Sequence, residues 1–230
     1  MSSKTVKIIF IFIFISFTTT LASAQESMKI DLSSLIKESQ QIINEDNKLT
    51  LVWWLPTEFW EVSFQKENNM SESEISEMIS YIDPYLIYIV VDGKIGPFGG
   101  MTYNSDNEIL STLELRDRNN ERYLPILEDD LNDNLKILLA AFKPIFASML
   151  GKMGENMNLY VFTANDKNNN KIAELKENGS FKVLVGGREF SWDLPFESVI
   201  PPQTCPKCSK SMSGSFKYCP WDGTKLKDKE

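Results

Sequence analysis

The sequence predicts an α+β fold with a strand-rich, β-sandwich-like body, several helices and a small C-terminal module. Three observations predict it. Short runs rich in β-branched and aromatic residues alternate with turn signals. Between them lie segments with helix-cap signals or helical apolar spacing. All three cysteines of the 230-residue chain come after residue 204, which sets the last segment apart from the body.

The first 24 residues match a secretory signal peptide. Lys4 and Lys7 precede the apolar run Ile8–Phe17, and an Ala22-Ser-Ala24 exit follows. A membrane span needs about 20 apolar residues, so this run is too short to remain as one. We therefore expect cleavage before Gln25, export to the periplasm or the extracellular space, and no stable membrane span after cleavage.

The first half of the body, which we expect over residues 25–199, alternates between predicted helices and strands. Asp31 caps a predicted helix that runs to Ile43. The β-branched and aromatic run 48–55 predicts a strand, and Thr57 after Pro56 starts a short helix. Ser71, three residues before Glu74, forms a capping box that opens a helix to about Ile82.

The second half contains most of the predicted strands. Residues 86–91 predict a strand that turns at Asp92-Gly93 and returns, and residues 112–124 predict a second hairpin. From Asp130 to Leu150, apolar residues recur with helical spacing, with Pro144 inside the helix. Three strands are expected to follow, at 159–163, 181–185 and 189–194, with Gly186-Gly187 as the last turn. Residues 200–204 predict an extended, Pro-rich linker.

Charge is distributed unevenly along the chain. Loss of Lys4 and Lys7 with the signal peptide changes the formal net charge from −8 to −10. The tail after residue 202 carries six lysines against three acidic residues, so the body carries −13. So acidic a body should repel nucleic acid, and we expect none as a partner. The tail lysines are expected to offset an anionic metal site.

The tail repeats one short pattern, Cys205-Pro-Lys-Cys208-Ser209 and Cys219-Pro-Trp-Asp222-Gly223. A two-residue gap lets both side chains of a tight turn reach the same ion. In these residues the tail, 205–226, resembles a zinc ribbon. The resemblance implies a closed, structural zinc site made by Cys205, Cys208, Cys219 and Asp222. Two positions differ from such ribbons: Ser209 replaces a glycine, and Asp222 replaces the fourth cysteine.

Two other interpretations of the cysteines stay open at this point. An exported protein favours disulfides, so Cys205 and Cys208 can pair and leave Cys219 unpaired. A redox role for Cys205-Pro-Lys-Cys208 is the third, but redox motifs of this spacing open a helix in a βαβ unit, whereas this one lies among turn residues at a chain end.

The body gives a weaker functional signal. The chain has no histidine, which excludes histidine triads and every histidine-containing metal site. We expect an exported binding protein for an unknown protein or small-molecule partner, with a structural zinc ribbon. The alternative is a cell-envelope hydrolase that uses carboxylates near Trp53–Glu61, where one of Trp53 and Trp54 can line a groove because the two point to opposite faces of the strand. A concave pocket with two carboxylates of perturbed pKa would favour the enzyme.

Overall fold

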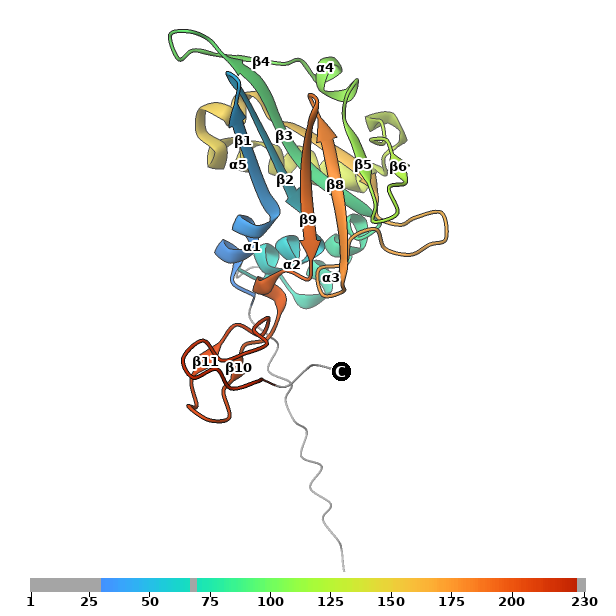
Figure 1. Ribbon diagram of the computed structural model, residues 1–230. Coiled ribbons are helices and arrows are strands. Elements are labelled where there is room, and N and C mark those ends of the chain that lie inside the picture. The colour runs from blue at the N-terminus through green and yellow to red at the C-terminus, as the bar shows by residue number, and fades with distance from the viewer. Residues whose placement is uncertain (1–29, 67–69, 227–230) are drawn as a thin grey trace, which may run out of the picture.

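The computed structural model describes residues 30–66 and 70–226, and the predicted signal peptide, residues 1–24, lies outside them. The protein has an α+β fold, as predicted. Two antiparallel sheets pack face to face, helices cover the outer face of one sheet, and the cysteine-bearing tail lies at one end (Figure 1).

The first sheet is organised around its longest strand, β3. One side of β3 pairs with β2, and the other side pairs with β7 along Tyr85–Val90 and with β4 along Gly93–Ile95. β1 pairs with the far side of β2, so β1, β4 and β7 lie at the margins of the sheet. The strands are β1 (Gln40–Glu45), β2 (Lys48–Leu55), β3 (Tyr85–Ile95), β4 (Met101–Tyr103) and β7 (Asn158–Thr163).

The second sheet has the order β6-β5-β8-β9. Gly186 and Gly187 have φ angles of 59° and 79° and form the predicted turn between β8 and β9, because only glycine adopts this left-handed backbone without strain. The strands are β5 (Glu114–Arg116), β6 (Arg122–Tyr123), β8 (Gly179–Val185) and β9 (Arg188–Leu194). β5 and β6 form the second hairpin expected from the sequence.

The two faces of β2 hold the layers together. Trp54 points to the second sheet and lies edge-on against Phe181, with ring centroids 4.8 Å apart. Trp53 points the other way and packs against Phe59 of α2 and Phe146 of α5, at 5.6 and 5.7 Å. Side chains alternate across a strand, so neighbouring tryptophans bury themselves in opposite layers. The result is helices, first sheet and second sheet, in that order.

Two helices begin at the caps that the sequence predicts, Asp31 and Ser71. The Oγ of Ser71 accepts the backbone N–H of Glu74 while the Glu74 carboxylate accepts the Ser71 N–H, which completes the capping box. The helices are α1 (Leu32–Ser39), α2 (Thr57–Lys66), α3 (Glu72–Ile82), α4 (Asp106–Leu110) and α5 (Asp133–Leu150). Short 3-10 turns are η1 (Glu128–Asp130), η2 (Gly151–Asn156) and η3 (Glu197–Val199).

α5 continues into η2, and this stretch, Asp133–Asn156, is long and apolar enough to cross a membrane by length and composition alone. Phe146 packs against the first sheet, as expected for a core helix. Ile145 and Met149, which the helical spacing places on the buried face, are half exposed at 52% and 54%. The face of α5 that is buried against the first sheet is therefore narrower than the apolar spacing of its sequence suggests.

The helix predicted from Asp31 to Ile43 is too long. α1 ends at Ser39, and Gln40–Glu45 forms β1, in which Gln40 pairs with Trp53 and Ile43 with Thr50. Asp46 and Asn47, with φ of 52° and 58°, make the tight turn to β2. This turn and the long ladder with β2 override the helical spacing, which is a local preference only.

The predicted turn at Asp92-Gly93 is also wrong, because β3 runs straight through both residues. Gly93 is needed for space there: a Cβ would lie 2.7 Å from the carbonyl oxygen of Thr102 on β4. The buried Asp92 carboxylate accepts hydrogen bonds from Thr50 Oγ1 and Asn104 Nδ2, both at 2.6 Å. The chain reverses farther on, where Gly99 has a φ of 78°.

Each of the two sheets takes strands from separate parts of the chain. β7, which follows α5, joins the N-terminal strands of the first sheet, while β8 and β9 join β5 in the second. The two strands that directly flank α5 in the chain, β6 and β7, therefore belong to different sheets.

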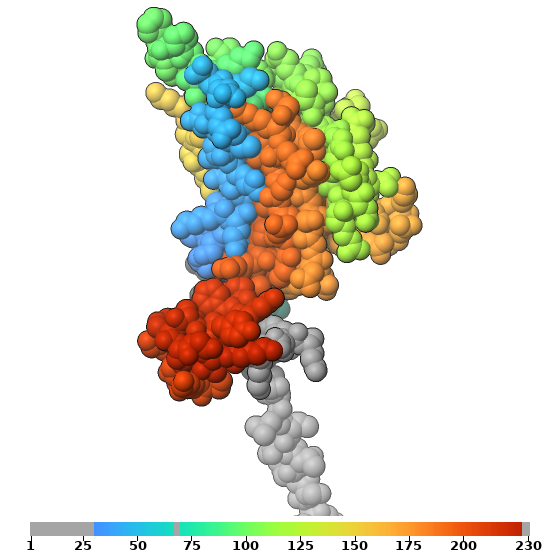
Figure 2. Space-filling view, viewed as in Figure 1, coloured from blue at the N-terminus to red at the C-terminus, as the bar shows by residue number. Residues whose placement is uncertain are grey.

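The tail forms a small lobe at one end of the body (Figure 2). β10 (Gln203–Thr204) pairs with β11 (Ser211–Met212), so the last two residues of the predicted linker belong to the sheet of the tail. Cys205, Met212, Cys219 and Leu226 form a buried cluster separate from the core of the body. Ser215 Oγ donates to Glu197 Oε1 of η3 at 3.0 Å, which links the lobe to the body.

Phe181→Ala is expected to lower the free energy of unfolding by about 3–5 kcal/mol, because it leaves a cavity between the sheets where Trp54 and Trp192 pack on the ring. Phe98→Ala, at a fully exposed ring, should change it by less than about 0.5 kcal/mol. Urea denaturation at equilibrium measures both, and equal losses would contradict the packing described here.

Candidate metal centre

Four side chains of the tail converge on one point. One ligand atom from each of Cys205, Cys208, Cys219 and Asp222 lies within 4.8 Å of all the others. The Sγ atoms of Cys208 and Cys219 are 3.7 Å apart, and the Sγ of Cys205 lies 3.6 Å from an Asp222 oxygen. All four predicted ligand positions are thus brought together, including the aspartate in the place of a cysteine.

Two turns of the same construction carry the four groups. In the first, Ser209 N–H donates to Cys205 O and Cys205 N–H to Lys210 O, at 2.9 and 3.0 Å. The second repeats this pattern fourteen residues later, from Gly223 to Cys219 O and from Cys219 to Thr224 O. The residue that closes each turn is left-handed, with φ of 58° at Ser209 and 70° at Gly223. Ser209 therefore adopts the conformation that a glycine takes without strain.

Backbone N–H groups fix the ligand atoms in place. The N–H groups of Lys207 and Cys208 point at the Cys205 sulfur, at 3.4 and 3.5 Å, and the Thr224 N–H donates to Asp222 Oδ1 at 2.9 Å. Such bonds orient ligands and stabilise their negative charge. The hydrogen bonds from Thr224 hold the pKa of Asp222 well below its usual range.

The donor set fits a tetrahedral metal ion. Metal–sulfur bonds of about 2.3 Å give a tetrahedron with edges of about 3.8 Å, close to the sulfur–sulfur and sulfur–oxygen separations found here. The Lys210 N–H lowers the pKa of Cys208, but burial and the neighbouring Cys205, Cys219 and Asp222 side chains outweigh it and raise this pKa to about 11. A cation at the centre would reverse this, because it stabilises the thiolate.

The structure bears on both other interpretations of the cysteines. All three are free thiols, with no disulfide between Cys205 and Cys208. The Cys205–Cys208 turn lies between the two short strands of the tail and opens no helix, unlike the redox motifs of the same spacing.

The carboxylates near Trp53–Glu61 line a separate pocket of about 220 Å³. Trp53 is buried in the helix layer, whereas Trp54 lines the pocket together with Glu58 and Glu61, which are three residues apart on α2 and so share one face. The Nε1 atom of Trp54 is buried and has no hydrogen-bond partner in the part of the chain that the structure describes.

Burial is the main cause that raises the pKa of Glu58, and the negative charges of Glu174 and Glu61 add to it. Burial also raises the pKa of Glu61, and the positive charge of Lys176 partly offsets this rise. Sequence reasoning did not place Glu174 or Lys176 in this pocket, because they come from the loop after β7 and reach it only in the folded chain. No local signal marks them.

The described residues also contain a larger groove, of about 380 Å³, between α5 and β7. Sequence reasoning missed it, because it treated α5 as a core helix with no functional face. The signal available was the pair of lysines, Lys136 and Lys143, one heptad apart on an otherwise apolar helix.

Comparison with protein-family models, with curated proteins and with solved structures gives no match to this chain.

Ser209→Gly is expected to stabilise the first turn by about 1 kcal/mol, because it removes left-handed strain. Gly223→Ser introduces the same strain in the second turn and should destabilise it by a similar amount. Hydrogen exchange of the amides at positions 209 and 223, measured at equal metal content, reports both. If both variants stabilised, or both destabilised, their turns, the two turns would not be equivalent.

Glu58→Gln is expected to stabilise the protein at neutral pH. A carboxyl whose pKa is raised by folding releases its proton first in the unfolded chain, so its ionisation favours unfolding above the ordinary value of 4.5. The gain should therefore vanish as the pH falls below that value. Glu74→Gln is the control of opposite sign, because hydrogen bonds from Ser71 lower the pKa of Glu74. Urea denaturation between about pH 4 and 7 measures both.

Proposed function

We propose that this protein is an exported binding protein whose C-terminal tail is a ribbon held by one structural zinc ion. The observation that supports the metal is the convergence of three thiols and one carboxylate from two matching turns. Four protein ligands fill a tetrahedral shell, and a filled shell leaves no position for a substrate or a reactive water. The metal therefore stabilises the tail and takes no part in catalysis.

Zinc suits this donor set better than the other common divalent ions. Thiolates are soft ligands that calcium and magnesium avoid, and zinc accepts both thiolate and carboxylate in a tetrahedral site. Apart from the cysteines, the buried cluster of the tail consists of Met212 and Leu226. Burial of so few apolar side chains cannot offset the conformational entropy that the tail loses on folding. Metal binding therefore supplies much of the free energy that folds the tail.

The binding role of the body follows from several features taken together. The basic start and Ala-x-Ala exit of residues 1–24 support export. The formal charge of the body, −13, disfavours nucleic acid as a partner. Partners remain a protein or a small molecule of the cell envelope or the extracellular space.

Cys219→Ser should lower the zinc content of the purified protein from near one equivalent to less than about a quarter, and it should make the tail protease-sensitive near Thr204. The unfolding of the body should change little. Asp222→Cys should bind zinc more tightly, because a fourth thiolate replaces an oxygen ligand. Elemental analysis and competition with a chelator measure these effects. Unchanged affinity in Asp222→Cys would show that Asp222 is no ligand.

The binding role is tested by retention of envelope proteins on the immobilised protein. A defined partner that elutes reproducibly from the wild type, and not from an unrelated acidic protein, is expected. Retention of no specific partner or small molecule from envelope and medium fractions would contradict the proposal.

A carboxylate-based hydrolase is the second candidate, and the pocket with Glu58 and Glu61 favours it. Two carboxylates with raised pKa values in one pocket are a common arrangement for acid–base chemistry. Hydrolysis of chromogenic glycosides and esters by the wild type, with loss in both Glu58→Gln and Glu61→Gln, would support it. Equal rates in all three proteins would remove it.

A further inference from the structure

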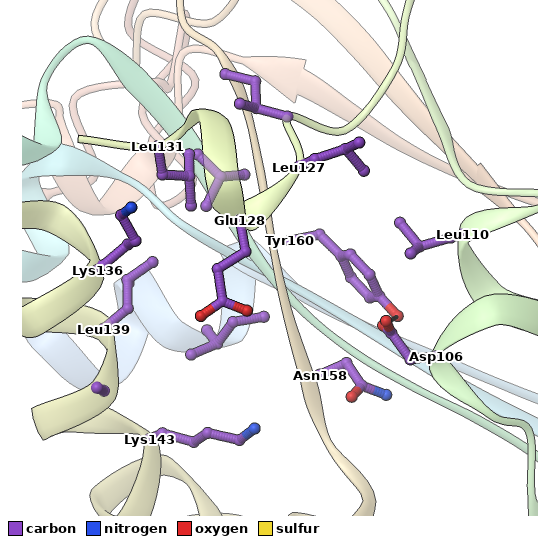
Figure 3. Close-up of a pocket in the computed structure, with 14 residues that line it drawn as sticks. Asp106, Leu110, Leu127, Glu128, Leu131, Lys136, Leu139, Lys143, Asn158 and Tyr160 are labelled. Atoms are coloured by element: carbon purple, nitrogen blue, oxygen red, sulfur yellow. Dashed lines mark hydrogen bonds between the residues drawn. The ribbon is translucent and has the colours of Figure 1, made fainter. Parts of the chain in front are cut away.

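The groove between α5 and β7 has the form of a peptide-binding site. Figure 3 shows Lys136, Leu139 and Lys143 along α5 on one side, and Asn158 and Tyr160 of β7 on the other. Its volume is about 380 Å³. The walls are mainly apolar and come from α4, the segment that leads into α5, α5 itself and β7; they include Leu110, Ile126, Leu127, Leu131, Leu139 and Val161.

β7 offers an unpaired edge to this groove. Ile126 N–H donates to the Val161 carbonyl at 2.7 Å, so the polar groups of Val161 point away from β3. Backbone groups alternate along an antiparallel strand, so the N–H and C=O of Leu159 point the same way. Neither has a partner among residues 30–66 and 70–226. An unpaired strand edge is a template for another strand.

One residue of the chain already pairs with this edge of β7, but the segment does not continue as a strand. Ile126 forms one antiparallel bridge with Val161, and the next residues turn away into η1 (Glu128–Asp130). The place beside Leu159 is left to another segment. An extended segment that continues the line of Ile126 would run antiparallel to β7 toward Asn158. Every second side chain of that segment would enter the apolar groove.

Two features at the rim complement such a segment. The Leu127 side chain is 60% exposed at the rim, where a bound chain would cover it. Lys136 pairs with Asp133 at 2.8 Å, whereas Lys143 has no ion pair within the described part of the chain. In Figure 3 the Lys143 side chain extends from α5 toward β7, at the end of the groove where Asn158 lies.

Two acidic side chains also line the groove: Asp106 accepts a hydrogen bond from the Tyr160 hydroxyl at 2.7 Å, and Glu128 points into the groove from η1. The position suited to a ligand carboxylate is therefore the end at Lys143, beside Asn158.

We propose that the groove binds an extended peptide segment of a partner protein, which adds to β7 as a strand, places an apolar side chain between α5 and β7, and pairs a carboxylate with Lys143. This inference rests on the proposed binding function and names the class of its partner. Main-chain hydrogen bonds to Leu159 would supply affinity that is independent of sequence, and the apolar walls and Lys143 would supply selectivity.

The test is selection of a random heptapeptide library with free carboxyl termini against the full mature chain. We expect enrichment of alternating apolar, β-branched sequences that carry an acidic residue or end at the carboxylate. Leu127→Ser should weaken a selected peptide by about tenfold, the cost of losing one apolar contact. Lys143→Glu should weaken it by about fivefold. N-methylation of the peptide bond opposite Leu159 should abolish binding, since it removes a donor.

Matched variants outside the groove serve as controls. Leu124, at 57% exposure, and the exposed Lys152 do not line the groove, so Leu124→Ser and Lys152→Glu should bind the peptide as the wild type does. Enrichment of no sequence, or equal binding by Leu127→Ser and Leu124→Ser, would overturn the proposal. Displacement of the peptide by phosphatidylglycerol vesicles would indicate a membrane surface instead, and a dimer dissociated by Leu127→Ser would indicate a second copy of this chain.

The envelope retention experiment separates this inference from the binding function on which it rests. A partner retained by the wild type and lost in Leu127→Ser supports both. A partner retained equally by the two proteins overturns the groove and leaves the binding function standing, and a wild type that retains nothing overturns the binding function.

Discussion

The double burial of the β2–β3 ladder is the constraint on which the rest of the protein depends. Both strands are apolar on both faces, so each face needs a cover. Trp53 meets the helix layer, and Trp54 meets the second sheet. Because two adjacent side chains must be buried in opposite directions, the helices and the second sheet are held on opposite sides of one central sheet.

The same ladder explains where the two pockets lie. β3 is longer than any strand on its outer side, so β4 and β7 share that side and leave margins. The margin at β7 meets α5, and among the residues that the structure describes only Ile126 pairs with this side of β7. A groove therefore forms where the main core ends. The acidic pocket near Trp54 forms in a comparable way, where α2 and the loop after β7 meet the edge of the core.

The tail follows a different physical principle from the body. Its two turns are set by local hydrogen bonds repeated at equal spacing, and they need little support from a core. The body is held by layers of aromatic side chains that are far apart in sequence. Local geometry brings three thiols and one carboxylate to one point, where their ligand atoms could hold a cation.

The sequence by itself determined the α+β class, most strands, the helix caps at Asp31 and Ser71, and the two turns that bring Cys205, Cys208, Cys219 and Asp222 together. These features are local: a cap needs three residues, a strand a short apolar run, and each metal turn four residues. Tertiary structure alone decided that Gln40–Glu45 is a strand, that β3 passes through Asp92-Gly93, and that β7 joins the first sheet. It also brought Glu174 to Glu58, and Lys143 to the unpaired edge of β7. Strand pairing and pocket formation depend on contacts between segments that are distant in sequence. The apolar pattern of one segment shows that it will be covered, but it does not specify which other segment covers it.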